Sequence, residues 1–430
     1  MLLSLLDKAS THGLSNFKDS PRNDSGRPFA GDRTGADAVP EAERMTRPLI
    51  ILHDFQSQEP SYHSDQGTIL AWIAAAHAQA EITLQQPATE DAREAILRKF
   101  RKLVMRFGCS TDRIRFRNSA LEDFTHTDWD RMRIFQLNHY PSGKPCGERS
   151  RFYGEVSGAA FDRFYLEETE PPPVLIHVTC TGYVSPSGAQ RLVAKRDWGR
   201  STEVLHAYHM GCYASLPAIR MAAGLVARGK ARVDIVHTEL CTLHMDPSQH
   251  LPEQLVVQTL FADGLIRYSA SRTGEEGPAR NGLELLATRE EIVPGTEDAM
   301  TWMVADFGMQ MTLSRRIPDH IRASLGAFLD RLAVASGQTS AQLCHEACFA
   351  IHPGGPRIID EIAEHLGLRP EQVQASNTIL WNYGNMSSAT LPHVWQSLLA
   401  DTAVPSGTLI VSLAFGPGLT ISGAILRKIG

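Results

Sequence analysis

The sequence has no long hydrophobic run, no excess of basic charge and no paired cysteine motif. No apolar segment approaches the roughly 18 residues that a membrane-spanning helix needs, so we expect no membrane span. Lys and Arg number 42 against 48 Asp and Glu, a net charge of -6, which gives no basic field for binding nucleic acid. The seven cysteines lack C-x-x-C pairs and the density of a disulfide framework. A soluble cytoplasmic protein with neither a metal site nor a nucleic-acid partner is therefore expected.

The N-terminal segment carries little that would fold. The opening "MLLSLLDKAS" has a short apolar run without preceding basic residues or a small-residue cleavage site, which argues against a secretory signal. Residues 1–46 are rich in Ser, Asp, Gly, Arg and Pro and show no apolar periodicity. We interpret this segment as a flexible leader.

From about residue 47, short β-type runs alternate with helical patterns, and the alternation recurs in the second part of the chain. This alternation predicts an α/β protein built from two similar halves. The predicted strands fall at 47–55, 171–182, 231–240, 348–355 and 407–426, the last as two strands around a glycine loop. The predicted helices fall at 66–81, 90–107, after Cys212 and from Pro356 to Leu368.

Cys212 lies between a glycine turn and a run of good helix formers in "HAYHMGCYASLPAIRMAAGL". A helix start leaves backbone N–H groups unpaired and carries the positive end of the peptide dipole, which lowers the pKa of a thiol placed there. We therefore expect Cys212 to ionise easily and to act as a nucleophile. The alternative is a small buried residue without chemistry, because free cysteine is among the most buried residue types.

His352 and Asn385 each occur where a regular element meets a glycine turn, a place where active sites of α/β proteins collect. His352 precedes Pro353, Gly354 and Gly355, so the backbone can approach a ligand closely, and the imidazole is a candidate acid, base or donor. Structural roles remain open for both: a packed histidine bonded to a carbonyl, and an asparagine that caps a helix.

Four motifs together resemble the thiolase-fold condensing enzymes, most closely the type III polyketide synthases of the chalcone synthase group. They are "HMGCYAS" with Cys212, "AIHPGGP" with His352, "YGNMSSA" with Asn385, and the terminal "AFGPGLT". The resemblance covers residues 47–430 and implies a layered αβαβα thiolase fold. Its two similar βαβ-type halves would be 47–240, carrying the cysteine, and 241–430, carrying the histidine and asparagine.

The resemblance implies a decarboxylative Claisen condensation. In that family the cysteine thiolate takes an acyl group from a thioester, while the histidine and asparagine hold a malonyl thioester whose decarboxylation gives the attacking enolate. Cys212, His352 and Asn385 would play these roles here, followed by ring closure to a pyrone or phenolic product. An imidazole N–H and an amide NH₂ are suitable donors for the developing charge. The implied substrates are coenzyme A or carrier-protein thioesters, with no bound cofactor, and the implied assembly is a homodimer.

The resemblance also implies substrate-binding positions, with departures from the family pattern. "TLFADGL" supplies Phe261, the first of two gatekeeping phenylalanines, but the second position is Met311, a more flexible side chain. Ser185 stands where plant members have a methionine that reaches into the partner's cavity. Ordinary core packing is the alternative for Phe261 and Met311. The remaining implied substrate-binding residues are Gly354, Gly355, Gly416, Pro417 and Gly418.

A predicted helix at 92–107 has a basic face opposite Ile96, Phe100 and Leu103. Related enzymes hold coenzyme A phosphates with basic residues in this region, and the same charge would suit an acidic acyl carrier protein. A solvated basic face is the alternative. The candidate phosphate-binding residues are Arg98, Lys99, Arg101 and Lys102.

Three other functions remain open at this point. A ketosynthase would join two preformed β-ketoacyl chains or elongate once with a carrier-protein substrate. A non-catalytic thiolase-fold subunit would only shape an active neighbour, although the intact Cys, His and Asn argue against it. A cysteine hydrolase would also use Cys and His.

Overall fold

The computed structural model describes residues 49–272 and 281–430, so the leader predicted at 1–46 lies outside the described residues. The strands are β1 (Ile50–Gln58), β2 (Tyr62–Asp65), β3 (Phe116–Ser119), β4 (Val174–Thr179), β5 (Glu203–Tyr208), β6 (Arg232–Leu240), β7 (Asp263–Arg272), β8 (Gly282–Ile292), β9 (Met300–Val304), β10 (Met309–Leu313), β11 (Cys348–Ile351), β12 (Leu409–Gly416) and β13 (Thr420–Ile429).

The helices follow the predicted pattern closely, including those at 66–81 and 90–107. They are α2 (Gln66–Gln85), α3 (Glu90–Phe107), α4 (Cys146–Phe164), α5 (Gly188–Lys195), α6 (Ser215–Ala227), α7 (Pro252–Leu260), α8 (Ile317–Ser336), α9 (Ser340–Glu346), α10 (Pro356–Leu366), α11 (Gln374–Tyr383) and α12 (Thr390–Ala400). Short 3-10 helices are η1 (Glu122–Thr125), η2 (Cys241–His244), η3 (Pro370–Val373) and η4 (Ser387–Ala389). No helix in the described ranges combines the length and apolar character needed to cross a membrane.

One sheet of nine strands runs through the molecule in the order β11-β12-β13-β8-β1-β7-β6-β4-β5. The same pairing occurs twice in it. In the first arm, β4 lies parallel to β6, β6 antiparallel to β7, and β7 antiparallel to β1. In the second arm, β11 lies parallel to β12, β12 antiparallel to β13, and β13 antiparallel to β8. Antiparallel pairing of β1 with β8 joins the arms, so the chain has the two similar halves that the alternation predicts.

The division between the halves after Leu240 stays a prediction. In the sheet, β7 pairs along its length with β6 and β1 of the first arm and ends at Arg272, and β8 begins the second arm at Gly282. The strand pairing therefore favours a later division than residue 240.

Helices α6 and α12 form a central layer between the two arms. The largest hydrophobic cluster contains the buried faces of both helices, strand residues of the first arm such as Ile176 and Ile235, and strand residues of the second arm such as Ile410 and Leu426. Trp395 of α12 is fully buried there and its indole N–H donates to the Ser412 hydroxyl at 2.8 Å. A helix buried on two sides must be apolar around most of its circumference, which explains the Ala-rich and Leu-rich sequences of α6 and α12.

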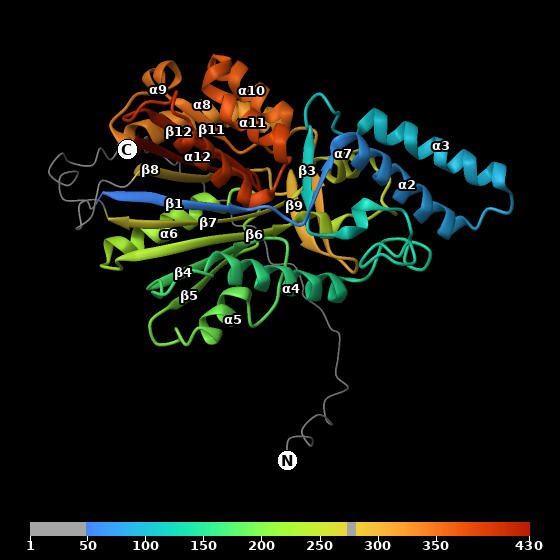
Figure 1. Ribbon diagram of the computed structural model, residues 1–430. Helices are drawn as coiled ribbons and strands as arrows, with labels where there is room; N and C mark the ends of the chain where they lie inside the picture. Colours follow the sequence, from blue (N-terminus) through green and yellow to red (C-terminus); the bar gives the residue numbers. More distant parts are fainter. Residues whose placement is uncertain (1–48, 273–280) are drawn as a thin grey trace, which may run out of the picture. The chain divides into compact units, whose positions relative to one another are not determined.

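Two outer layers of helices complete the five-layer arrangement. Helices α4 and α5 cover the free face of the first arm through Phe161, Phe164 and Leu192. Helices α8, α10 and α11 cover the free face of the second arm through a cluster around Phe328 and Ile359. Figure 1 shows the first pair below the sheet and the second group above it. This is the predicted αβαβα layering, and the strands read as nearly continuous apolar runs because both of their faces are covered.

Helices α2, α3 and α7 lie together beyond one end of the sheet, beside the β9–β10 hairpin (Figure 1). Helix α3 is amphipathic as predicted: Ile96, Phe100 and Val104 are buried, and Arg98 and Lys99 are exposed. Thr89 caps its N-terminus by accepting from the Ala92 N–H. Helix α7 connects these three helices to the sheet, because it leads directly into β7 by way of Phe261.

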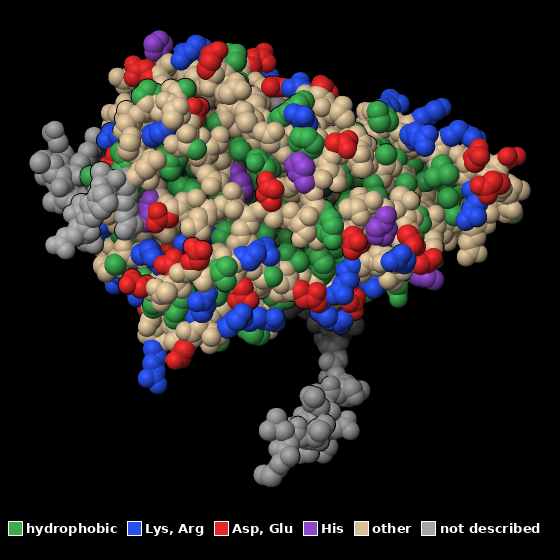
Figure 2. All heavy atoms as spheres, viewed as in Figure 1, with side chains coloured by type: hydrophobic (Ala, Val, Ile, Leu, Met, Phe, Trp, Pro, Cys, Tyr) green, Lys and Arg blue, Asp and Glu red, His purple; other side chains and the backbone are tan. Residues whose placement is uncertain are grey.

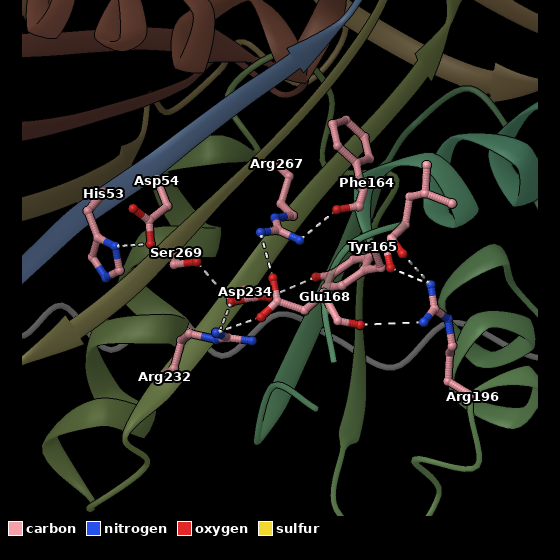
Figure 3. A network of polar contacts seen from close by, with 11 residues as sticks. His53, Asp54, Phe164, Tyr165, Glu168, Arg196, Arg232, Asp234, Arg267 and Ser269 are labelled. Carbon is pink, nitrogen blue, oxygen red and sulfur yellow. Dashed lines mark hydrogen bonds and ion pairs between the residues drawn. The ribbon is translucent and has the colours of Figure 1, made fainter. Parts of the chain in front are cut away.

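A buried polar network fastens α4 to the amino end of β6 (Figure 3). The Asp234 carboxylate, fully buried, accepts from the Tyr165 hydroxyl at 2.8 Å and the Ser269 hydroxyl at 2.9 Å, and it pairs with Arg232 at 3.1 Å. Glu168 bridges the guanidinium groups of Arg232 and Arg267. The buried charges are paired and hydrogen-bonded, which offsets the cost of burying them. Removing one member leaves its partners unpaired in the core and destabilises the fold.

We predict that Asp234→Ala destabilises the fold by about 2–4 kcal/mol, because it leaves the buried hydroxyl groups of Tyr165 and Ser269 without their acceptor and removes one of the two carboxylates that pair with Arg232. Denaturant unfolding followed by circular dichroism measures the change. The matched control is Glu94→Ala, which removes an exposed ion pair with Arg98 and should change stability by less than about 1 kcal/mol. Equal effects of the two substitutions would contradict the structural role assigned to Asp234.

Candidate active site

Cys212 lies in a tight turn between β5 and α6, three residues before α6 begins at Ser215. His209 and Gly211 have positive φ values of 61° and 83°, which turn the chain sharply at the carboxyl end of β5. A Cβ on Gly211 would lie 2.7 Å from Cδ of Pro417, so glycine is required for this close approach. The contact joins the predicted "HMGCYAS" and "AFGPGLT" motifs, which are about half the chain apart in sequence.

Asn385 follows α11 and is held by backbone pairing with the segment before β7. Its N–H donates to the Leu260 carbonyl at 3.0 Å, and its carbonyl accepts from the Ala262 N–H at 2.8 Å. The side-chain oxygen accepts from the Ser387 N–H at 2.9 Å. This bond fixes the amide group with its NH₂ end turned away from the Ser387 backbone, and hydrogen bonds from Asn385 and Ser387 side chains reach the Cys212 sulfur. The structure thus brings Cys212 and Asn385 together.

His352 lies at the carboxyl end of β11, where its N–H donates to the Leu413 carbonyl of β12 at 2.7 Å. The side chain is buried, yet neither ring nitrogen has a hydrogen-bond partner among the described residues. Burial lowers the pKa of the imidazole to about 3, so the ring is neutral at neutral pH. The structure gives no direct hydrogen bond from His352 to Cys212 or Asn385, and His352 is not among the residues that line the pocket beside Cys212.

A pocket lies beside Cys212 and contains several of the predicted residues; its atom-free space of about 760 Å³ includes open solvent. Phe261 and Met311 lie in its wall as expected, together with Pro417. The β9–β10 hairpin covers it: the Trp302 indole N–H donates to the Cys180 carbonyl at 2.6 Å, and His244 links the Thr181 carbonyl to the Met309 N–H. Other lining residues are Arg117, Phe124, Gly211, Cys241, Thr242, Met245, Gln254, Val257, Gln258, Met300 and Ser387.

The remaining predicted residues are not among those that line this pocket. A Cβ on Gly416 would collide with the Tyr213 ring beside Cys212, so that glycine has a packing reason. Gly418 has φ 67° and its N–H donates to the Met300 carbonyl at 3.1 Å. Gly354 and Gly355 follow His352, where a Cβ on Gly355 would touch Leu260. The basic residues Arg98, Lys99, Arg101 and Lys102 are exposed on α3 and do not line the pocket.

Comparisons with known proteins show what the chain is similar to. Residues 284–430 match the family of chalcone and stilbene synthases, C-terminal domain. A probable polyketide synthase 1 of Dictyostelium discoideum is 33% identical over 260 residues, which are 59% of this chain and 8% of that protein. Type III polyketide synthase C of Arabidopsis thaliana is 28% identical over 263 residues, 59% of this chain and 67% of that protein.

The solved structure of PKS-I from the brown alga Ectocarpus siliculosus has the same fold. The superposition gives a TM-score of 0.75 at 24% identity and covers 89% of this chain and 99% of that one. In part of its sequence and in its fold, the chain is similar to type III polyketide synthases. The matched part nevertheless spans a small fraction of the Dictyostelium protein, and the activity of this chain is therefore argued from its own residues below.

The charge state of Cys212 in the structure differs from the sequence-based expectation. Burial raises the pKa of the thiol to about 12, and the charge of Glu239 adds to the rise, although hydrogen bonds from Ser387 and Asn385 oppose it. The expectation of an easily ionised thiol was wrong for the unliganded enzyme. Desolvation in a closed pocket outweighs the helix start, which is offset by three residues from the sulfur-bearing residue. The resting site holds a neutral thiol beside a neutral imidazole.

A polar cluster below Cys212 was missed in the sequence. The fully buried Glu239 at the end of β6 accepts from the Cys180 N–H and from the Thr181 hydroxyl at 2.7 Å, and Ser388 also donates to it. The Ser387 hydroxyl lies 2.9 Å from the Cys180 sulfur and 3.8 Å from the Cys212 sulfur. The sequence offered one indication of this cluster, the Glu239 carboxylate in the apolar strand "ARVDIVHTEL". A carboxylate is rarely buried unless polar groups surround it.

No cluster of His, Cys, Asp or Glu in the described part of the chain is arranged to hold a metal ion.

Arg117 is a second residue that the sequence did not reveal, because "DRIRFRNS" contains three arginines and only the third is buried. Its guanidinium lines the pocket and donates to the carbonyls of Gln258 and Phe261.

We predict that alkylation of Cys212 by iodoacetamide is slow at pH 7 and rises about tenfold per pH unit up to at least pH 9.5, because a raised pKa keeps the thiolate fraction small below that pKa. Glu239→Gln should speed the reaction at every pH, since it removes the negative charge that opposes ionisation. Mass spectrometry of the Cys212 peptide gives the rate. A plateau reached below pH 7 would contradict the neutral resting thiol.

Proposed function

We propose that the protein is a condensing enzyme that extends a Cys212-bound acyl group with a malonyl thioester. The proposal is supported by one arrangement: Cys212 lies in the wall of the pocket and is reached by the side chain of Asn385 from the other half of the fold. The chain also has a buried histidine, His352, whose ring nitrogens have no hydrogen-bond partner among the described residues. A nucleophile, an amide donor and an imidazole donor in a closed site are the groups that acyl transfer through an enolate requires.

The first step would be acyl transfer to Cys212. The sulfur attacks the thioester carbonyl, the carbon–sulfur bond to the carrier breaks, and the carrier leaves as a thiol. The Cys212 proton passes to His352 and then to the departing sulfur, which balances the step. Because thiol and imidazole are both neutral at rest, this proton transfer is expected only with the acyl thioester in place, where the developing charge is held by the site's donors.

The second step would form the carbon–carbon bond. The bond between the malonyl carboxylate and its methylene breaks, carbon dioxide leaves, and the electron pair becomes an enolate whose oxygen is held by the His352 N–H and the Asn385 NH₂. The enolate carbon attacks the acyl carbonyl on Cys212 and expels the thiolate, which recovers a proton. A dry pocket strengthens both hydrogen bonds and protects the enolate from protonation by water.

We predict that Cys212→Ala abolishes acyl-enzyme formation and lowers product formation by at least about 1,000-fold, because the nucleophile is lost. His352→Gln and Asn385→Ala should lower malonyl decarboxylation by about 100–1,000-fold, the usual loss for one oxyanion donor. The measurement is mass spectrometry of protein and products after incubation with malonyl and acyl thioesters, each offered on coenzyme A and on a carrier protein.

The matched control is Cys344→Ala, a half-buried cysteine on α9 in the outer layer, which should leave product formation unchanged. Acylated Cys212 that yields only hydrolysed acid would favour a cysteine hydrolase. Absence of both the acyl-enzyme and any condensed product with every donor would refute catalysis by this chain.

The exposed basic side chains of α3 are proposed to hold the phosphates of the thioester carrier. Figure 2 shows Lys and Arg side chains gathered over α3, and α3 ends at Phe107 beside the pocket-lining helix α7, where the Cys109 N–H donates to the Thr259 hydroxyl. Arg98 pairs with Glu94 and Lys99 with Glu81, so Arg101 and Lys102 are the better candidates. Coenzyme A and a phosphopantetheine-bearing acyl carrier protein both present such an anionic group.

We predict that the double substitution Arg101→Gln, Lys102→Gln raises KM for a coenzyme A thioester at least fivefold without lowering kcat, because only ground-state binding of the phosphates is lost. The KM for the corresponding N-acetylcysteamine thioester, which has no phosphate, should not change. Steady-state kinetics with both donors makes the comparison, with Glu90→Gln, Asp91→Asn at the other end of α3 as the control. Unchanged KM for coenzyme A and carrier-protein donors would refute the assignment.

A homodimer is proposed because β5 is an edge strand with exposed apolar surface. Leu205 on β5 is 38% exposed and Tyr183 beside it is 40% exposed, and one side of the strand has no partner strand in the described sheet. Natural edge strands are usually covered or charged, so a second copy pairing along β5 would remove this liability.

A reducing cytoplasm suits a protein in which every cysteine is a free thiol.

A further inference from the structure

Arg117 is a fully buried cation in the wall of the pocket that holds Cys212. Only 4% of its surface is exposed. Burial lowers the pKa of the guanidinium to about 10, so it remains protonated at neutral pH. Within the described ranges it forms no ion pair, and the nearby Asp263 carboxylate is occupied by the Ala120 N–H and the N–H and hydroxyl of Thr242. A buried charge without a counterion is costly unless a ligand supplies one.

The hydrogen bonds of Arg117 leave one side of its guanidinium open. Nη1 donates to the Gln258 carbonyl at 2.9 Å and the Phe261 carbonyl at 2.7 Å, which caps the end of α7. Nε and Nη2 are buried and have no partner. These two N–H groups lie side by side in the guanidinium plane and form the fork that binds both oxygens of a carboxylate. A helix-capping role explains the hydrogen bonds of Nη1, but it does not explain why Nε and Nη2 have no partner.

The open fork lies close to the residue proposed to hold the extender. The Arg117 side chain passes Gly384, where a Cβ would lie 3.1 Å from its Cγ, and Gly384 precedes Asn385. Phe261, whose carbonyl Arg117 binds, pairs with Asn385 in an isolated bridge. In a malonyl thioester the carboxylate is separated from the thioester carbonyl by one methylene group. A malonyl group bound to Asn385 through its carbonyl therefore has its carboxylate within the neighbourhood of Arg117.

We propose that Arg117 binds the carboxylate of the malonyl extender through Nε and Nη2 and so selects a carboxylated thioester over an uncharged one. This inference rests on the proposed function. During decarboxylation the carbon–carbon electron pair moves to the enolate oxygen at His352 and Asn385, and carbon dioxide leaves uncharged. Arg117 therefore stabilises the bound substrate more than the transition state, and its contribution appears in KM rather than in kcat.

The test is Arg117→Met, which keeps an aliphatic side chain against Gly384 and removes the guanidinium with its charge. The KM for malonyl coenzyme A in decarboxylation should rise at least tenfold, with kcat unchanged or higher. The inhibition constant of acetyl coenzyme A, which lacks the carboxylate, should stay within twofold. Arg117→Lys should restore part of the malonyl affinity as a point charge without the fork. Arg115→Met, an exposed arginine two residues away, is the matched control and should change neither constant.

Equal changes for malonyl and acetyl coenzyme A, or none, would overturn the inference and leave Arg117 as a helix cap. A second measurement needs no turnover: malonate should slow alkylation of Cys212 in the wild type more than uncharged malonamide does, and Arg117→Met should abolish the difference. If no malonyl thioester is turned over but this difference is present, the proposed function fails and the carboxylate site stands. If Arg117→Met does not fold, equal protection by malonate and malonamide in the wild type overturns the site.

Discussion

The burial of α6 and α12 between the two arms of one sheet is the constraint on which the rest of the structure depends. Helix α12 and the first turns of α6 are buried on nearly all sides, whereas Arg220, Gly224 and Ala227 leave one side of the later turns of α6 exposed. Both helices are fixed by packing against strands of both halves. Each is preceded by a segment that carries a proposed catalytic residue: Cys212 before α6 and Asn385 before α12. Because both segments emerge at the same end of the central layer, the packing of apolar side chains brings polar residues from distant sequence together.

Close packing also determines where glycine is required. Gly211 must lack a Cβ because Pro417 lies against it, and Gly416 must lack one because the Tyr213 ring occupies that space. These contacts cross between the halves and tie the cysteine turn to the loop between β12 and β13. The positions of the motif glycines are thus set by distances between backbones, and a substrate is not needed to explain them.

Much of this arrangement follows from the sequence. The alternation of apolar runs and helical patterns predicts the layers, since every strand that is covered on both faces must be continuously apolar. Cys212, Asn385, Phe261 and Met311 were found from local motifs; the structure brings Cys212, Phe261 and Met311 to one pocket and places the Asn385 side chain near Cys212. The thiol pKa could not be predicted, because it depends on how completely the pocket excludes water. That property arises from the β9–β10 hairpin and α7, neither of which adjoins Cys212 in sequence.

Glu239 and Arg117 were missed for the same physical reason: a charge becomes informative only when its burial is known. Glu239 raises the cost of ionising Cys212, whereas Arg117 offers an open guanidinium fork to an anion in the same pocket. The proposed catalytic residues Cys212 and Asn385 adjoin the central layer, where packing restricts change. Arg117 on β3, Trp302 on β9 and Met311 on β10 lie on elements outside that layer. Substitutions in this outer wall alter the shape and charge of the pocket without moving Cys212 or Asn385, so the wall is the part of the site in which substrate choice can change while the condensing chemistry is kept.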